Sequence, residues 1–254
     1  MTGRIQSLWR HPVKGFTPER LASAALTAGG YFPCDRIYAV ENGPSGFDPL
    51  APAFVSKGHF AVLARIAEVA RARTAYDEAS GVLRVSAQGR PGLAADLTTA
   101  EGRAAFEAWL ADFLGEEATG PLKVVQAPGH RFTDHPLGHV SIVNLASVRD
   151  LSDKIGRTVD PLRFRANLYV DGWPAWSELE MEPGRGLALG TARATLFKPI
   201  VRCVATHVDP ATGERDIDVV AALFDHYGHL HCGVYVQLDE SGAVAEGDAA
   251  RWLA

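Results

Sequence analysis

Short apolar segments separated by Gly, Pro and Asn run through most of the sequence, and this alternation limits the folds open to it. Such segments are typical of β-strands, because glycine and asparagine accept the positive φ of tight turns at low cost. Strand-like segments outnumber helical ones. This predicts an α+β fold that is mainly β, with helices packed outside a β-barrel rather than on a parallel sheet. The expected strands cover residues 5–9, 21–26, 36–40, 82–85, 123–126, 139–143, 164–170, 187–189, 192–197 and 233–238.

Three segments are expected to be helical. Apolar side chains over residues 106–114 recur at i, i+3, i+4, i+7 and i+8, which places them on one face of an α-helix. Thr98 is expected to cap this helix and Gly115 to end it. A second helix is expected to begin after Asn144, and a third over residues 220–227.

Chain length fits one large domain or two small ones. The 254 residues are enough to bury a core without disulfide bridges. Residues 116–121 are polar and end in Gly-Pro, which makes them the best candidate for a domain boundary. We therefore expect a smaller β-rich domain over residues 1–118 and a second domain over residues 119–254.

Charge and composition exclude several classes of protein. The 25 Lys and Arg against 30 Asp and Glu give a net charge of −5, so there is no basic excess for a nucleic acid. No apolar run reaches the ~18–20 residues that span a bilayer, and the first residues lack the apolar stretch of a secretion signal. The three cysteines are too few and too scattered for a disulfide framework, which favours a reduced, cytoplasmic compartment.

The thiols and histidines are the candidates for chemistry, because the sequence has no dinucleotide fingerprint, Walker loop, Gly-x-Ser-x-Gly elbow or His-Glu-x-x-His. Cys203 directly follows Arg202 at the end of an expected strand, and a neighbouring cation favours the thiolate form. A thiolate is a nucleophile or a ligand for a soft metal. The competing interpretation is that Cys203 is a small buried apolar residue.

A cluster of histidines offers a second candidate. His226, His229 and His231 precede Cys232, and imidazole and thiol groups at short spacing can hold zinc. The cluster lies in one crowded segment without a Cys-x-x-Cys partner, so histidines of a solvated turn are the better interpretation.

Cationic residues suggest a site for an anion. Arg163, Arg165 and Asn167 lie two residues apart, and on the expected strand they would face one side. Two guanidinium groups and an amide on one side suit a phosphate or another compact anion. Lys14 and Arg36 are further cationic positions. Without a nearby thiolate, a solvated strand face explains the same pattern.

Taken together, these segments resemble the MOSC family, the molybdenum cofactor sulfurase C-terminal domain preceded by its N-terminal β-barrel domain. The resemblance covers nearly the whole chain, and its layout is similar to that of the amidoxime-reducing components. It implies a MOSC-type β-barrel with flanking helices. The motifs that carry it are Pro12-Val13-Lys14, Asp35-Arg36, Phe164-Arg165-Ala166-Asn167, Trp176-Ser177-Glu178-Leu179, Arg202-Cys203, Val208-Asp209-Pro210-Ala211-Thr212-Gly213 and Gly233-Val234-Tyr235.

The resemblance implies a molybdenum cofactor, Mo-molybdopterin, with Cys203 as ligand of the metal and catalytic centre. It also implies that a set of polar side chains holds the pterin and its phosphate, with Arg202 helping to keep Cys203 as a thiolate. This cofactor-binding set is Lys14, Arg36, Ser141, Arg165, Asn167 and Arg202. Relatives often have serine at the positions of Gly15 and Val201 and arginine at that of Lys57, which bears on substrate range and cofactor variant.

The function implied is that of an oxidoreductase that removes oxygen from small N-hydroxylated or N-oxide substrates by oxygen-atom transfer. Electrons would come from an external reductase, a flavin, haem or iron–sulfur protein, and His139 or Asp134 would relay protons. The alternative is a carrier that binds the cofactor, or sulfur as a Cys203 persulfide, without turnover. A zinc hydrolase built on His226, His229 and His231 is a third hypothesis.

Overall fold

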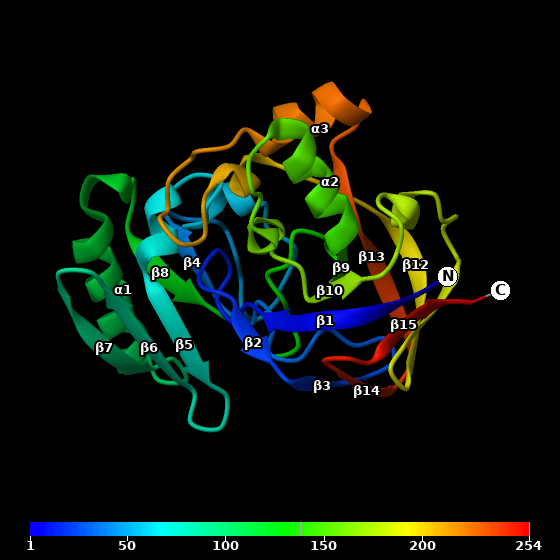
Figure 1. Ribbon diagram of the computed structural model, residues 1–254. Coiled ribbons are helices and arrows are strands. Elements are labelled where there is room, and N and C mark those ends of the chain that lie inside the picture. The colour runs from blue at the N-terminus through cyan, green and yellow to red at the C-terminus, as the bar shows by residue number, and fades with distance from the viewer. Residues whose placement is uncertain (138, 254) are drawn as a thin grey trace.

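A closed β-barrel forms the larger part of the molecule (Figure 1). The computed structural model describes residues 1–137 and 139–253. Within these residues, seven strands follow one another around the barrel in the order β10, β9, β13, β12, β11, β15 and β1, and β1 pairs back onto β10. The short strand β2 (Glu19–Leu21) extends the sheet beside β1. The barrel strands are β1 (Thr2–Arg10), β9 (Val140–Asn144), β10 (Leu168–Asp171), β11 (Gly186–Leu189), β12 (Ala192–Val201), β13 (His231–Glu240) and β15 (Ala249–Trp252).

Burial of alternate side chains explains the closure of the barrel. In β1, Ile5 is buried between exposed neighbours, and an irregularity in the pairing between Ile5 and Ser7 brings Leu8 to the same core as Val170 of β10 and Val234 of β13. Side chains of a strand alternate between two faces, so the apolar face of each strand can turn to one shared interior. The prediction of a mainly β fold with a barrel and helices is confirmed. Because β1 lies in this barrel, the first ten residues pack with strands from the second half of the chain.

A smaller β-rich region lies beside the barrel (Figure 1). It contains a three-stranded antiparallel sheet, a two-stranded sheet and a helix that packs on both. Residues 73–77 and 82–87 pair as an antiparallel hairpin, and the helix expected over residues 106–114 is confirmed. Its cap is Thr99 rather than Thr98, because the Thr99 hydroxyl accepts the hydrogen bond from the Gly102 amide. The elements are β4 (Ala39–Asn42), β5 (Arg73–Asp77), β6 (Val82–Ala87), β7 (Arg90–Asp96), α1 (Ala100–Leu114) and β8 (Leu122–Val125).

One expected strand is wrong in a way that matters for the site. Residues 164–170 do not form one strand, because Pro161–Phe164 is a 3-10 helix. The Asp160 side chain caps this helix, and Arg165 ends it with a left-handed φ of 50°. Strand β10 therefore begins only at Leu168.

Strands β3 (Ser23–Leu26) and β14 (Gly242–Ala245) pair with each other beside the barrel. The sequence did not predict strands β7, β14 and β15.

Two helices, α2 (Leu145–Ile155) and α3 (Val219–Tyr227), lie side by side on the outside of the barrel (Figure 1). As expected, Asn144 caps α2. The buried carboxylate of Glu178 fixes this start, because it accepts hydrogen bonds from Asn144 Nδ2 at 2.8 Å and Ser147 Oγ at 2.9 Å. Burial raises the pKa of Glu178. Among the described residues, no helix combines the length and apolarity needed to cross a membrane.

We expect Glu178→Ala to destabilise the fold by about 2–4 kcal/mol, because it leaves two buried polar groups, the Asn144 amide and the Ser147 hydroxyl, without their acceptor. The free energy of unfolding in urea measures the effect. Glu180→Ala is the matched control, since Glu180 is exposed on the same segment. Equal unfolding free energies for the two variants would contradict this role of Glu178.

Candidate functional site

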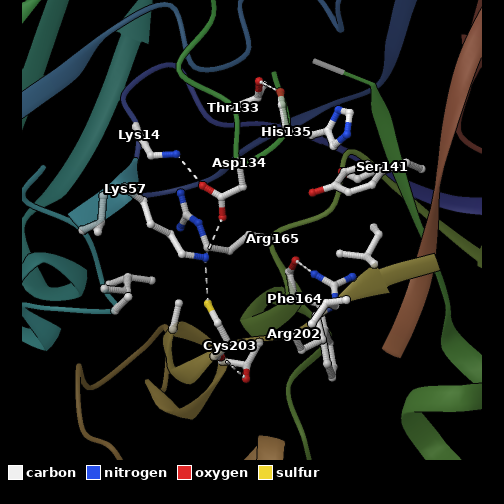
Figure 2. A pocket seen from close by; sticks show the side chains of 18 of the residues that line it. Lys14, Lys57, Thr133, Asp134, His135, Ser141, Phe164, Arg165, Arg202 and Cys203 are labelled. Carbon is white, nitrogen blue, oxygen red and sulfur yellow. Dashed lines mark hydrogen bonds and ion pairs between the residues drawn. The ribbon is translucent and has the colours of Figure 1, made fainter. Parts of the chain in front are cut away.

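A cavity of about 440 Å³ lies at the end of the barrel and is lined by residues from both halves of the chain (Figure 2). Lys14 follows β1, Lys57 begins a short 3-10 helix (Lys57–His59) between β4 and β5, and Cys203 follows β12. The volume is in the range of sites for small molecules and cofactors, roughly 300–1,000 Å³. Segments far apart in the sequence thus contribute charged and nucleophilic side chains to one space.

Cys203 lines this cavity, partly exposed, at the point where β12 ends and the 3-10 helix Val204–His207 begins. Its sulfur lies 3.1 Å from Lys57 Nζ, which donates a hydrogen bond to it. A thiol that contacts an ammonium group in a polar cavity is available to a ligand. The interpretation of Cys203 as filler between apolar side chains does not describe these surroundings.

Asp134 joins two cations of the site. One carboxylate oxygen forms an ion pair with Lys14, and the other lies 3.2 Å from Lys57 Nζ. Burial alone would raise the pKa of Asp134, but the two ammonium groups outweigh it and hold that pKa well below its usual range. Lys14 is only 4% exposed, and its ammonium also donates to the Phe132 carbonyl at 2.8 Å. Asp134 is therefore ionised at neutral pH.

Two guanidinium groups add positive charge next to Lys14. Arg36 forms an ion pair with Asp35 and donates to the Arg165 carbonyl at 2.9 Å. The Nη2 atom of Arg165 is buried and has no hydrogen-bond partner among the described residues. Burial, and then the charge of Arg36, lower the pKa of Arg165 to about 10. A buried, unpaired guanidinium nitrogen that lines a cavity indicates a site for an anion.

Ser141 and Asn167 form a unit, of which Ser141 alone lines the cavity. The Asn167 amide oxygen accepts hydrogen bonds from Ser141 Oγ at 2.9 Å and from the Ser141 amide at 3.1 Å, and its Nδ2 donates to the Trp9 carbonyl. Asn167 is 1% exposed. It lies behind the cavity wall and holds Ser141 in position, which differs from the direct contact with a cofactor that we expected.

The contacts of Arg202 also differ from the role that we expected for it. The Arg202 guanidinium donates to the Cys232 carbonyl at 2.7 Å and to the Phe164 carbonyl at 2.8 Å, so its hydrogen bonds connect neighbouring segments. Lys57, rather than Arg202, is the cation that contacts the Cys203 sulfur.

Arg163 and Arg165 do not share a face, because they belong to a 3-10 helix and its end rather than to a strand. The Arg163 side chain is 1% exposed and pairs with Asp209 and Asp216 at 2.9 and 2.7 Å. The anion site therefore has Arg165 with Arg36 in place of the expected pair of Arg163 and Arg165.

The histidine-rich segment does not form a metal site in the part of the chain that the structure describes, where no three His, Cys, Asp or Glu side chains converge. Cys232 is fully buried in the core around α2 and α3, and burial raises the pKa of its thiol to about 12. His229 stacks on Tyr227 with ring centroids 5.9 Å apart.

The family resemblance implies a serine at the position of Gly15 in many relatives, and the backbone explains the glycine in this chain. Gly15 has a φ of +92°, and a Cβ atom there would lie 2.9 Å from the Val62 Cα atom. Any larger residue would strain the turn that follows Lys14. A serine hydroxyl is therefore not available at this position to contact a ligand.

Several lining residues were missed as binding residues by sequence reasoning. Lys57 stood out only as a departure from the family pattern, and Asp134 only as a proton relay. Tyr235 stood out only as part of a family motif, because a strand residue gives no sign of the cavity until the barrel brings it there.

We expect Asp134→Asn to strengthen binding of inorganic phosphate to the purified protein by about three- to tenfold, because it removes the carboxylate that neutralises Lys14 and Lys57. Isothermal titration calorimetry at low ionic strength measures the dissociation constant. Asp153→Asn, on the exposed face of α2, is the control for the change in net charge. An unchanged constant in Asp134→Asn would refute the role of this carboxylate.

Comparison with known proteins gives two domain matches. Residues 2–120 match the MOSC N-terminal beta barrel domain, and residues 129–251 match the MOSC domain. Similar curated proteins include two called molybdenum cofactor sulfurase. That of Drosophila erecta is 28% identical over 200 residues, which cover 74% of this chain and 23% of the relative. That of Caenorhabditis elegans is 30% identical over 145 residues, 54% of this chain and 20% of the relative. The chain thus spans about a fifth of the length of these relatives.

Two solved structures align with parts or most of this chain. The YuaD protein from Bacillus subtilis aligns with a TM-score of 0.49 and 15% identity, over 98% of this chain and 94% of that one. YiiM from Geobacillus stearothermophilus aligns with a TM-score of 0.36 and 17% identity, over 45% and 54% of the two chains. The family rests on the sequence matches, which together extend from residue 2 to residue 251 with only 121–128 outside them. The chain therefore belongs to the MOSC domain family.

Proposed function

We propose that this protein holds a molybdenum cofactor in the cavity and reduces N-hydroxylated or N-oxide substrates there by oxygen-atom transfer. The observation that carries the proposal is the cavity itself, in which the Cys203 sulfur and the cations Lys14, Arg36 and Arg165 line one space. Membership of the MOSC family, and relatives called molybdenum cofactor sulfurase, support an association with this cofactor.

The donor set fits the chemistry of the cofactor. Molybdenum accepts soft sulfur ligands, and Cys203 presents a sulfur to the cavity. The pterin carries a phosphate, and the unpaired Nη2 of Arg165 beside Arg36 suits an anion. Cys203 would therefore ligate the metal, while Lys14, Arg36 and Arg165 would hold the phosphate end. When bound, the cofactor supplies a metal centre that accepts an oxygen atom and is restored by two electrons.

Side chains of the cavity would supply protons, because reduction of an N-hydroxyl group to an amine-type product and water consumes two protons and two electrons. Asp134 is a poor donor, since its pKa is held low by Lys14 and Lys57. His139 is the better candidate. Burial, followed by the charges of His135 and Lys198, lowers the pKa of His139, so its ring is neutral at pH 7 and would relay a proton by accepting one before it donates it. The two electrons would come from a separate flavin, haem or iron–sulfur protein.

A second candidate function is that of a carrier. The name of the relatives, molybdenum cofactor sulfurase, favours a protein that handles the cofactor or its sulfur. In that case Cys203 would carry a persulfide or hold the cofactor for transfer, without turnover. Steady reduction of benzamidoxime with an artificial electron donor supports the enzyme. Transfer of cofactor to an apo-molybdoenzyme without reduction of benzamidoxime supports the carrier.

We expect Cys203→Ser to lower the molybdenum content of protein made in a molybdenum-sufficient host at least about tenfold, because a serine hydroxyl is a hard donor in place of a soft one. Elemental analysis measures the content, and reduction of benzamidoxime should fall with it. Cys34→Ser is the control, since Cys34 does not line the cavity. Equal metal content and equal activity in Cys203→Ser and the native protein would remove the central assignment.

A further inference from the structure

One wall of the cavity is aromatic and lies away from the thiol. We call it the aromatic wall, and in Figure 2 its residue His135 lies across the cavity from Lys57 and Cys203. The wall consists of His135, His139 and Tyr235, which all line the cavity. The rings of His135 and His139 stack with centroids 5.2 Å apart, and Tyr235 of β13 lies 5.9 Å from His135. Phe197 does not line the cavity but supports the wall, since its ring packs against that of His139 at 4.1 Å.

A cation lies at the edge of the aromatic wall. Lys198 follows Phe197 on β12, is exposed, and lines the same cavity. Its ammonium lies 5.3 Å from the centre of the Phe197 ring. Within the described part of the chain this ammonium has no ion pair or hydrogen bond, and the one acidic side chain that lines the cavity, Asp134, is already paired with Lys14 and Lys57. Lys198 therefore has a charge to offer to a ligand.

A second polar atom at this wall is unsatisfied. The Nε2 atom of His139 is buried and has no hydrogen-bond partner among the described residues. Burial, and then nearby charge, lower the pKa of both His135 and His139. The two rings are therefore neutral at pH 7, so a ring nitrogen can donate a single hydrogen bond, and Lys198 supplies the positive charge at this end.

We propose that the aromatic wall and Lys198 form a substrate subsite for a planar aromatic group that carries a carboxylate. The ring would pack against His135, His139 and Tyr235, and the carboxylate would pair with Lys198. This inference rests on the proposed function and specifies its substrate class, an anionic aryl N-hydroxyl compound. Arg36 and Arg165, which are not part of this subsite, would serve the cofactor.

The test compares binding of two probes, benzamidoxime and 4-carboxybenzamidoxime, to the oxidised protein as purified, without an electron donor, so that nothing turns over. We expect calorimetry to show that the carboxylate probe binds about three- to fivefold more tightly at low ionic strength, because a partly exposed ion pair contributes modestly. This preference should shrink in 0.5 M salt, where the Debye length falls to roughly 4 Å.

Substitutions assign the preference to residues. Lys198→Gln should abolish the preference, so that the two probes bind equally tightly, whereas Lys154→Gln, an exposed lysine of α2, should retain it. Tyr235→Leu should weaken both probes by a similar factor, about two- to tenfold, because an aromatic ring of the wall is lost while an apolar side chain remains.

Any of three results would overturn the proposed subsite. The native protein could bind both probes with equal affinity, it could bind neither probe, or the preference could persist in Lys198→Gln. Failure of the proposed function is recognised separately, on the same preparations, by molybdenum content and by reduction of benzamidoxime. Reduction of benzamidoxime without a carboxylate preference refutes only the subsite. A carboxylate preference without any reduction refutes only the proposed enzyme and leaves the subsite as a binding site.

Discussion

Pairing of the first strand with β10 is the constraint on which the site depends. The Trp9 amide donates to the Asn167 carbonyl at 2.8 Å, and so β1 delivers the segment that follows it to the end of the barrel. Lys14 then lies beside Arg36, whose guanidinium reaches the Arg165 carbonyl 129 residues further along the chain. Barrel closure therefore does more than bury Ile5 and Leu8. It assembles positive charge from two distant parts of the chain in one cavity.

That positive charge would be costly to bury without counter-ions, since an unpaired buried charge loses its hydration. Asp35 and Asp134 offset part of it, by pairing with Arg36 and with Lys14 and Lys57. Arg165 remains unsatisfied at Nη2. The protein as a whole carries a net charge of −5, so this concentration of cations is a local property of the site. Binding of an anion would complete the compensation.

The two ends of the cavity have different chemistry, and the proposed function uses both. One end combines the Cys203 sulfur with Lys57 and guanidinium groups, a set suited to a soft metal and an anionic cofactor. The other end combines the stacked rings of His135 and His139 with the ammonium of Lys198, a set suited to the body of a substrate. A substrate held between them would have its reducible group towards the sulfur and its remaining part on the aromatic wall.

Local sequence patterns were enough to predict the mainly β fold and, from its 3.6-residue period, helix α1. They also predicted the cap at Asn144 and the position of Cys203 at the end of a strand. These features could be predicted because they depend on residues that are neighbours in the chain. The family motifs also pointed to Lys14, Arg36 and Arg165. Packing alone decided that Arg163 turns to Asp209 and Asp216, and that Asn167 lies behind Ser141. It also decided that Lys57 contacts a sulfur 146 residues away, since such contacts follow from barrel closure and leave no local pattern to read.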